Sequence, residues 1–278
     1  MPAQTTILLL IPCYNCDDNI ADVIRRLTPA SLARLSEVLV IDNGSQDNTV
    51  RNAVDAAREH GPGTIKVLLN DANYGLGGTH KVAIDYGRRK GYDYLAVLHG
   101  DGQAASEELD DVIAALDASA GADAVLGCRF MKASRIRGYS KLRTAGNKFF
   151  NLVYSVLTGR RIYDLGSGLN IFSLKSLDTI NLEKLSDVCD FNYCLLLAMI
   201  EKNMRFINVP ISWSESGQRS NVTTWGIGLK CLKTVWNWRI GALFPGMIPV
   251  RDYSRRRTYT INDYSGASRP LEEPLGKK

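Results

Sequence analysis

An apolar run followed by a glycine-rich turn with one carboxylate is the feature of this sequence that most directly suggests chemistry. Residues 94–98 are mostly apolar, and His99-Gly100-Asp101-Gly102-Gln103 follows them. A carboxylate at a strand end can hold a divalent cation against phosphates, because Mg²⁺ takes few protein carboxylates and completes its shell with water and phosphate oxygens. The alternative interpretation is a strand-to-helix turn in which Asp101 is a solvated cap.

Polar loops also follow two earlier apolar runs. The first is Pro12-Cys13-Tyr14-Asn15, and the second is Asp42-Asn43-Gly44-Ser45-Gln46-Asp47. A loop aspartate can accept hydrogen bonds from the edge of a uracil or a guanine, and a neighbouring tyrosine can pack on the base. Asp42 and Ser45 are equally typical of an Asx turn before a helix.

Residues 73–78, Asn-Tyr-Gly-Leu-Gly-Gly, precede an expected helix, so their amides are candidates to face an anion. The segment lacks the Lys-Ser/Thr of a phosphate-binding P-loop. It is also not the dinucleotide fingerprint, which belongs to the first strand-to-helix turn.

The elements that must position these loops alternate along the first half of the chain. We expect strands at residues 6–11, 37–41, 66–69, 94–98 and 124–127. Between them we expect helices at residues 20–27, 49–60, from after 78 to about 90, and 106–118. This alternation predicts an α/β fold with a parallel sheet and helices on both faces. Ligands bind at the carboxyl ends of such strands, where all of these loops are expected to gather.

The second half is less regular. We expect helices at residues 141–157, 190–202 and 225–243, and strands at 169–172 and 205–211. A turn at residues 164–168 leads into the first of these strands. Residues 251–278 are polar and are expected to form a mobile tail. The expected division is therefore a catalytic-type domain over residues 1–215, a loop and amphipathic helix over 216–250, and the tail.

Composition narrows the function classes. The 278 residues suffice for one large α/β domain, and the hydrophobic content of 45% can fill its core. The net charge of +5 is compatible with anionic substrates such as nucleotide sugars or lipid phosphates. It is too small a bias to indicate a nucleic-acid partner.

Neither targeting nor membrane-spanning segments are expected. No basic region precedes the first apolar run, which is too short for a signal peptide. The longest later candidate, residues 240–250, is interrupted by Pro245 and Pro249 and falls short of a membrane span. These features predict a soluble, cytoplasmic protein.

Cys13 and Cys16 form a C-x-x-C pair, which can serve redox or zinc chemistry. A zinc site needs a second ligand pair at suitable spacing, and the sequence offers none. His60, His80 and His99 lie in unrelated sequence contexts. We therefore expect the cysteines to be reduced thiols.

Taken together, the motifs resemble those of the GT-A glycosyltransferases of family 2, in particular the branch of dolichol-phosphate mannose synthase and other polyprenyl-phosphate glycosyltransferases. The matching segments occur in the family's order and spacing between about residues 6 and 221. They are residues 11–15, 38–49, 73–78, 99–103, 125–130, 166–172 and 207–213. The resemblance implies the GT-A fold, a mainly parallel central sheet flanked by helices, here with a C-terminal amphipathic helix.

The resemblance also implies roles for individual residues in an inverting sugar transfer from a nucleoside diphosphate sugar. Asp101 would hold Mg²⁺ or Mn²⁺ on the diphosphate, with the Gly100 backbone and Gln103 beside it. Arg129 would face the donor diphosphate or the acceptor phosphate. The base pocket would be formed by Pro12, Tyr14, Asn15, Ile41, Asp42, Asn43 and Ser45. A basic loop over the donor would carry Arg219, Ser220 and Asn221. A metal and positioned cations would stabilise the charge that develops on the leaving diphosphate.

Three positions depart from the family pattern. His99 replaces the first carboxylate of the D-x-D motif, although a neutral imidazole can still bind a metal or a phosphate. Asn43 replaces a usual aspartate. Cys194 stands where an acidic residue is common, and Asp190 lies one turn earlier.

A hydroxyl acceptor would need a general base, for which Asp164 and Asp190 are the candidates. A lipid phosphate is already anionic and needs no strong base. Asp164 has the equal alternative of fixing the turn at residues 166–168.

We therefore interpret the chain as a metal-dependent glycosyltransferase. Its donor is a UDP- or GDP-sugar, with UDP favoured, and its acceptor is a polyprenyl phosphate or a small molecule. The helix at residues 225–243 carries Trp225, Trp236 and Trp238 with Lys230, Lys233 and Arg239, and suits a peripheral membrane contact. Core packing or a contact between copies is the alternative, and the oligomeric state stays open.

Two rival functions deserve comparison. The loss of one D-x-D carboxylate suggests a non-catalytic nucleotide-sugar-binding or partner subunit with the same fold. A nucleotidyltransferase shares a similar sheet, but it would place a loop rich in glycine and basic residues after the first strand. This chain has residues 12–15, Pro-Cys-Tyr-Asn, at that position.

Overall fold

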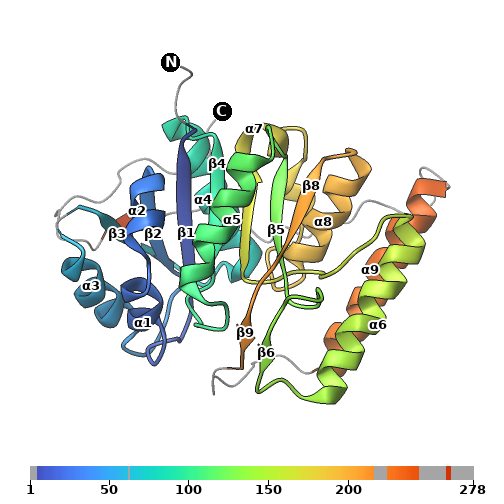
Figure 1. The fold of residues 1–278 in the computed structure, drawn as a ribbon, viewed down its shortest axis with the longest axis horizontal. Helices are drawn as coiled ribbons and strands as arrows, with labels where there is room; N and C mark the ends of the chain where they lie inside the picture. Colours follow the sequence, from blue (N-terminus) through green and yellow to red (C-terminus); the bar gives the residue numbers. More distant parts are fainter. Residues whose placement is uncertain (1–4, 62, 216–223, 244–260, 264–278) are drawn as a thin grey trace.

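Buried apolar strands form the centre of the protein in the computed structural model, which describes residues 5–61, 63–215, 224–243 and 261–263. An eight-stranded sheet has the order β10-β3-β2-β1-β4-β7-β5-β8 (Figure 1). Its strands are β1 (Ile7–Cys13), β2 (Glu37–Asp42), β3 (Ile65–Asn70), β4 (Tyr94–Leu98), β5 (Ala124–Cys128), β7 (Leu169–Ser173), β8 (Phe206–Pro210) and β10 (Ile261–Asp263).

Most neighbouring strands are parallel, which confirms the predicted mainly parallel sheet. β1 pairs in parallel with β2 and β4, β2 with β3, and β5 with β8. β7 instead runs antiparallel between β4 and β5. The chain enters β7 beside the carboxyl end of β4, where His99 N donates to Gly168 O over 2.8 Å, so β7 can only run back in the opposite direction.

Helices cover both faces of the sheet, because side chains along each strand alternate between them. On one face Ile7, Leu9 and Ile11 pack against a first group of helices, and on the other face Leu8 and Leu10 pack against a second. The first group is α1 (Ile20–Arg25), α2 (Pro29–Arg34), α3 (Thr49–Glu59) and α5 (Leu109–Ala118). The second group is α4 (Gly75–Lys90), α7 (Leu174–Leu177) and α8 (Phe191–Glu201).

The predicted boundaries hold to within a few residues, with informative exceptions. The predicted helix at 106–118 begins with a 3₁₀ turn, η1 (Ser106–Glu108), and a second 3₁₀ turn, η2 (Leu182–Lys184), precedes α8. α4 begins at Gly75, inside the segment expected to be a loop. α2 was not predicted, although its signals are present: the Thr28 side chain accepts from Ser31 N, and Pro29 occupies the first turn.

Two long helices lie beyond α8 at the edge of the molecule. They are α6 (Lys141–Thr158) and α9 (Thr224–Leu243), which run side by side in Figure 1. Their inner sides share a buried cluster with α8 that includes Tyr154, Leu196 and Val235. Among the described residues, none of the helices has the length and apolar character needed to cross a bilayer.

Two short segments extend the sheet system. β6 (Ile136–Arg137) pairs in parallel with β9 (Trp213–Ser214), and Ala104 forms a bridge with Trp213. β10 pairs antiparallel with β3, so residues 261–263 form a strand inside the segment expected to be a mobile tail. The rest of that segment lies outside the described residues.

The N-terminal turns of α4 meet the backbone of residues 186–188 directly. A Cβ on Gly77 would lie 2.3 Å from the carbonyl oxygen of Ser186, and Gly78 N donates to Asp187 O over 3.1 Å. The amide of Gly78 is therefore used inside the protein rather than by an anion. Glycine is required at position 77 because no side chain fits.

We predict that Gly77→Ala lowers the free energy of unfolding by about 1–3 kcal/mol, since the added methyl group must push two backbones apart. Gly146→Ala in α6 is the matched control, because a Cβ there meets no atom within 4 Å. It should raise stability by about 0.5–1 kcal/mol through helix propensity. Urea unfolding followed by circular dichroism measures both. Equal effects of the two substitutions would contradict the contact.

Candidate functional site

The loops that follow β1, β2 and β4 are joined at the carboxyl edge of the sheet. Gly100 N donates to Pro12 O over 3.0 Å, and Asn43 N donates to Cys13 O over 2.9 Å. These bonds extend the strand pairing into the loops. The predicted gathering of the polar loops at one edge is therefore confirmed for these segments.

Side chains fasten the β1 loop to the β2 loop. Asn15 N donates to Ser45 Oγ over 2.8 Å, and Gln46 N donates to Asn15 Oδ1 over 2.9 Å. Asn15 has a φ of +48°, a left-handed conformation that asparagine tolerates better than most residues. This fixed loop presents Tyr14, which is 38% exposed, as the large aromatic side chain at this edge.

Asp42 holds the turn that follows β2. Its Oδ2 accepts from the amides of Gly44 and Ser45, each over 2.9 Å, and its Oδ1 accepts from Ser45 Oγ. Asp42 has 0% exposure. The Asx-turn interpretation is thus what the structure shows for Asp42 and Ser45, while contact of either residue with a base stays a prediction.

Asn43 connects the β2 loop to the loop before α4. Its Oδ1 accepts from Asn70 Nδ2 over 3.0 Å and from Tyr74 N over 2.8 Å, and its Nδ2 donates to Asn73 Oδ1 over 2.9 Å. An aspartate could make only the first two bonds, because an ionised carboxylate has no donor. Position 43 departs from the family pattern, and Asn73 accepts the additional hydrogen bond that asparagine donates there.

Asp101 lies in the turn after β4. Its Oδ1 accepts from Gln103 N over 3.1 Å. Burial raises the pKa of the Asp101 carboxyl above its ordinary value, while the Gln103 amide and the charge of Arg129 favour the ionised form. A cation beside Asp101 would offset the cost of partly removing this carboxylate from water.

The buried His80 packs against the half-buried His99, although their sequence contexts are unrelated. Their rings pack edge to face with centroids 6.0 Å apart, and His80 Nδ1 is 2.8 Å from Leu76 O. Burial, with a smaller contribution from Arg129, lowers the pKa of His99 to about 4. Its Nε2 is buried and has no hydrogen-bond partner among the described residues. His99 is therefore neutral near pH 7, the form that binds a metal.

Arg129 is locked to Asp164 at the end of β5. Arg129 Nε and backbone N each donate to Asp164 Oδ2 over 2.8 Å, and one terminal nitrogen donates to Oδ1 over 2.7 Å. The guanidinium also lies 4.7 Å from the ring centroid of Trp213. Asp164 also accepts from Gly166 N over 3.2 Å. It therefore fixes the turn at residues 166–168, which is one of the two roles that the sequence left open for it.

The turn after β4 is held from its other side by β9. Ser214 N donates to Gln103 O over 2.8 Å, and Ser212 N donates to Glu108 Oε2 over 2.7 Å. Since Trp213 also stacks on Arg129, the β9 segment connects Gln103 to the buried ion pair.

Asp190, the second candidate base, is 1% exposed at the start of α8. Its Oδ2 lies 2.6 Å from Lys230 Nζ of α9, and Ser186 Oγ donates to its Oδ1. Cys194 lies one turn later in α8, and burial raises the pKa of its thiol to about 12. Asp190 is therefore engaged by a cation from a distant helix.

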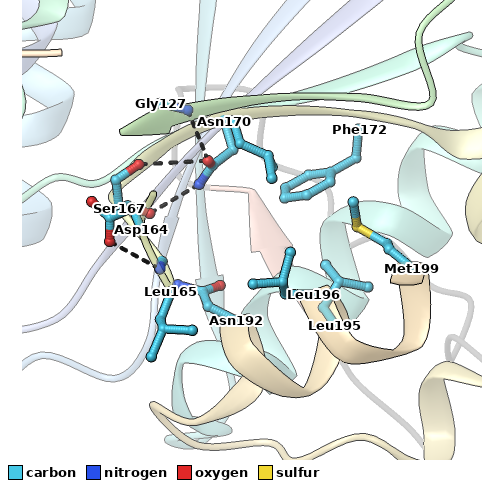
Figure 2. A pocket seen from close by; sticks show the side chains of 12 residues that line it. Gly127, Asp164, Leu165, Ser167, Asn170, Phe172, Asn192, Leu195, Leu196 and Met199 are labelled. Carbon is cyan, nitrogen blue, oxygen red and sulfur yellow. Dashed lines mark hydrogen bonds between the residues drawn. The ribbon is translucent and has the colours of Figure 1, made fainter. Parts of the chain in front are cut away.

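A small cavity lies between the turn at 164–168 and α8. Its volume is about 20 Å³, close to the space of one water molecule. Figure 2 shows polar groups of Ser167 and Asn170 at one end and Phe172 and Met199 at the other. Asn170 Oδ1 accepts from Gly127 N over 3.2 Å. The cavity is too small for a nucleotide or a sugar, so the candidate donor site is the edge formed by the loops.

Other predicted site residues have simpler outcomes. Pro12, Ile41 and Gly100 are buried in the joined loops, and Arg219, Ser220 and Asn221 lie outside the described residues.

In the part of the chain that the structure describes, no group of three or more His, Cys, Asp or Glu side chains is arranged to hold a metal. Cys13 and Cys16 are buried, and the Cys16 contact and burial raise the pKa of Cys13, which disfavours the thiolate form.

Sequence reasoning missed the buried Lys81 and assigned Lys230 to a membrane contact instead of an ion pair. Lys81 Nζ lies 2.6 Å from Asp187 Oδ1, and their side chains are 6% and 2% exposed. Lys81 and Lys230 each pair with a carboxylate in residues 187–190, far away in the chain. The sequence did offer a signal for Lys81, because this lysine stands among apolar residues of the predicted helix at residues 79–90. A lysine that is buried among such residues nearly always has an ionic partner.

Comparison with known proteins identifies the family. Residues 9–180 match the model of glycosyl transferase family 2. The chain belongs to this family. It is a glycosyltransferase, and the fold and branch expected from its motifs are both confirmed.

Curated relatives of this glycosyltransferase act on polyprenyl phosphates by name. Polyprenol monophosphomannose synthase of Mycolicibacterium smegmatis is 30% identical over 77% of this chain and 79% of its own length. Undecaprenyl-phosphate mannosyltransferase of Micrococcus luteus is 26% identical over 87% of this chain and 97% of its own.

Solved structures show the same fold. Glucosyl-3-phosphoglycerate synthase from Mycobacterium tuberculosis, solved with Mn²⁺, UDP and phosphoglyceric acid, superposes with a TM-score of 0.62. The match covers 86% of this glycosyltransferase and 79% of that chain at 15% identity, so it supports the fold alone.

We predict that Asp164→Asn lowers the free energy of unfolding by about 3 kcal/mol, because it leaves the Arg129 charge buried without a counter-charge. Asp117→Asn is the matched control. The Arg34–Asp117 pair has the same N–O distance of 2.7 Å but is far more exposed, at 27% and 48% against 11% and 2%. It should cost no more than about 1 kcal/mol. Guanidinium unfolding measures both, and similar losses would refute the buried role.

We also predict that His80 makes stability depend on pH. Burial, and then the neighbouring His99, lower the pKa of His80 from 6.5 to about 3. The unfolded chain therefore binds more protons between these values, so stability is full above pH 6.5 and falls as the pH drops towards 3. His80→Gln should reduce the slope between pH 4.5 and 6.5 by about 1 kcal/mol per pH unit, as measured by urea unfolding at each pH. An unchanged slope would show that His80 does not titrate in this way.

Proposed function

We propose that this glycosyltransferase transfers a sugar, with inversion, from a nucleoside diphosphate sugar to a polyprenyl phosphate. The observation that carries the proposal is that the loops after β1, β2 and β4 are joined at one edge of the sheet, where the charge of Arg129 acts on Asp101, in a family 2 chain. The names of its curated relatives support the acceptor class.

We favour UDP as the nucleotide of the donor. Tyr14 is the exposed aromatic side chain on which a base can pack. Pro12, Asn15 and Ile41 would form the pocket around it. Because Asp42, Asn43 and Ser45 are hydrogen-bonded within the protein, we propose that they act by fixing the shape of this pocket. A protein of the same fold, solved with UDP bound, shows that this fold can hold that nucleotide.

We propose that Mg²⁺ or Mn²⁺ binds at Asp101, with His99 Nε2, which has no hydrogen-bond partner among the described residues, as a second ligand atom. The residues fit such an ion, because a half-buried carboxylate and a neutral imidazole are both able to bind it. So few protein ligands suit a metal whose remaining positions are filled by phosphate oxygens, with Gly100 and Gln103 alongside. When bound, the ion would neutralise charge on the leaving diphosphate.

The proposed acceptor explains why both candidate bases are engaged by cations. A phosphate oxygen of the lipid attacks the anomeric carbon, the bond from that carbon to the diphosphate breaks, and the nucleoside diphosphate leaves. An anionic phosphate needs no proton removed, so Asp164 can hold Arg129 and Asp190 can pair with Lys230. Arg219, Ser220 and Asn221 are proposed to close over the donor.

The alternatives are a small-molecule acceptor and a non-catalytic nucleotide-sugar-binding subunit. The second rests on the absence of the first D-x-D carboxylate at His99. A cytoplasmic location stays a prediction from the sequence.

The test is transfer of labelled sugar from UDP- and GDP-sugars to undecaprenyl phosphate in detergent, with Mg²⁺ or Mn²⁺. We expect a labelled lipid product with one donor class, and a loss of at least about 100-fold in Asp101→Asn. Asp111→Asn, at an exposed position of α5, is the control and should keep full activity. Calorimetric titration of UDP with Mn²⁺ should show weaker binding in Asp101→Asn.

Each failure has a distinct meaning. Binding of a nucleotide sugar without turnover would favour the non-catalytic subunit. Turnover that Asp101→Asn leaves intact would remove Asp101 from the proposed metal site.

A further inference from the structure

The imidazole of His99 is held by contacts on the ring itself. A Cβ on Gly168 would lie 2.8 Å from Cγ of His99, so the ring lies directly against the backbone of residue 168. His80 contacts the same ring, with centroids 6.0 Å apart and ring planes at 77°. These two neighbours restrict rotation of the His99 imidazole, because packed side chains keep a single rotamer.

His80 is itself fixed in one orientation. Its side chain is 2% exposed, and its Nδ1 lies 2.8 Å from Leu76 O, one turn earlier in α4. Because a carbonyl oxygen only accepts, Nδ1 of His80 donates this bond, which sets the plane of the ring. The ring of Phe191 also packs against His80, with centroids 5.2 Å apart. His80 therefore contacts both Phe191 and His99.

The helix that carries His80 cannot move away from these rings without breaking buried contacts. A Cβ on Gly77 would lie 2.8 Å from Cβ of Phe191, so α4 and α8 are in direct contact there. Lys81, the residue after His80, pairs with the buried Asp187. The backbone on each side of position 80 is thus attached to the start of α8 or to the segment before it.

This rigid packing leaves one polar atom of His99 open. Its Nε2 is buried and has no hydrogen-bond partner among the described residues. A buried polar atom without a partner costs free energy, which a ligand at that atom recovers. A neutral imidazole attracts a cation only at short range, so its contribution to metal binding depends on how well the ring is oriented beforehand.

We propose that His80 is a positioning residue, which holds the His99 imidazole in the orientation that brings Nε2 to the metal of the donor. The inference rests on the proposed function, because it takes His99 as a ligand of that metal. His80 does not bind the ion itself, since its side chain is buried and its Nδ1 is bonded to Leu76 O. Because His80 acts through the shape of its ring, an aromatic ring without nitrogen should replace it.

Calorimetric titration of Mn²⁺ in the presence of excess UDP is the first test. His80→Ala should weaken Mn²⁺ binding by about 10-fold, the loss typical of a residue that orients a metal ligand. His80→Phe should bind Mn²⁺ nearly as tightly as the wild-type protein. His60→Ala is the matched control, because it removes an imidazole that contacts Ile24 O on another helix, and it should bind normally. Circular dichroism checks that each variant is folded.

Pulsed electron paramagnetic resonance of the bound Mn²⁺ supplies a signature that a loss of stability alone would not change. The wild-type complex should show coupling to a directly bound nitrogen nucleus, and His99→Gln should abolish it. His80→Ala should weaken this coupling, whereas His80→Phe should keep it.

The outcomes separate this inference from the proposed function. A wild-type complex without nitrogen coupling would remove His99 from the metal site and overturn both. Coupling that His99→Gln abolishes but His80→Ala leaves at full strength, with unchanged Mn²⁺ affinity, would overturn the positioning role alone. Equal losses in His80→Phe and His80→Ala would also overturn it, because the nitrogen atoms of His80 rather than the shape of its ring would then matter.

Discussion

The ion pair between Arg129 and Asp164 is the interaction on which the arrangement of the candidate site depends. It joins the end of β5 to the turn that starts β7, and Trp213 of β9 covers it. Gly168 O of the same turn accepts a hydrogen bond from His99 N. These contacts therefore also set the position of the loop after β4. A buried pair of this kind contributes little net stability by itself, but losing one partner is costly. Its main effect is therefore to fix geometry.

Segments far apart in the chain complete the site through close contacts. α4 meets residues 186–188 backbone to backbone at Gly77, and Lys81 pairs with Asp187 beneath that contact. Lys230 then ties α9 to the start of α8 at Asp190. These long-range contacts add support to the turn that Asp42 holds locally after β2.

Much of this fold could be predicted from the sequence, because the buried strands are apolar runs with clear ends. The predicted strand at residues 94–98 has the same bounds as β4 in the structure, and the loop after it lies at the carboxyl edge of the sheet. The direction of β7 could not be predicted, since it depends on the path of α6 and not on residues 169–173. β6 and β9 are too short to leave a periodic pattern. In the candidate site, Asp101 and Arg129 are predictions from the motifs, whereas the partners of Asn43 and Asp190 are tertiary and leave no local signal.

The neutral state of His99 has a consequence for how the site meets a polyanion. Of the described residues at this edge, Arg129 brings a positive charge that Asp164 already cancels, and the imidazoles of His80 and His99 bring none near pH 7. With Asp101 ionised, the loops present a slightly negative surface. For the proposed nucleoside diphosphate donor, this charge would oppose entry of the diphosphate alone and would favour entry together with a counter-ion.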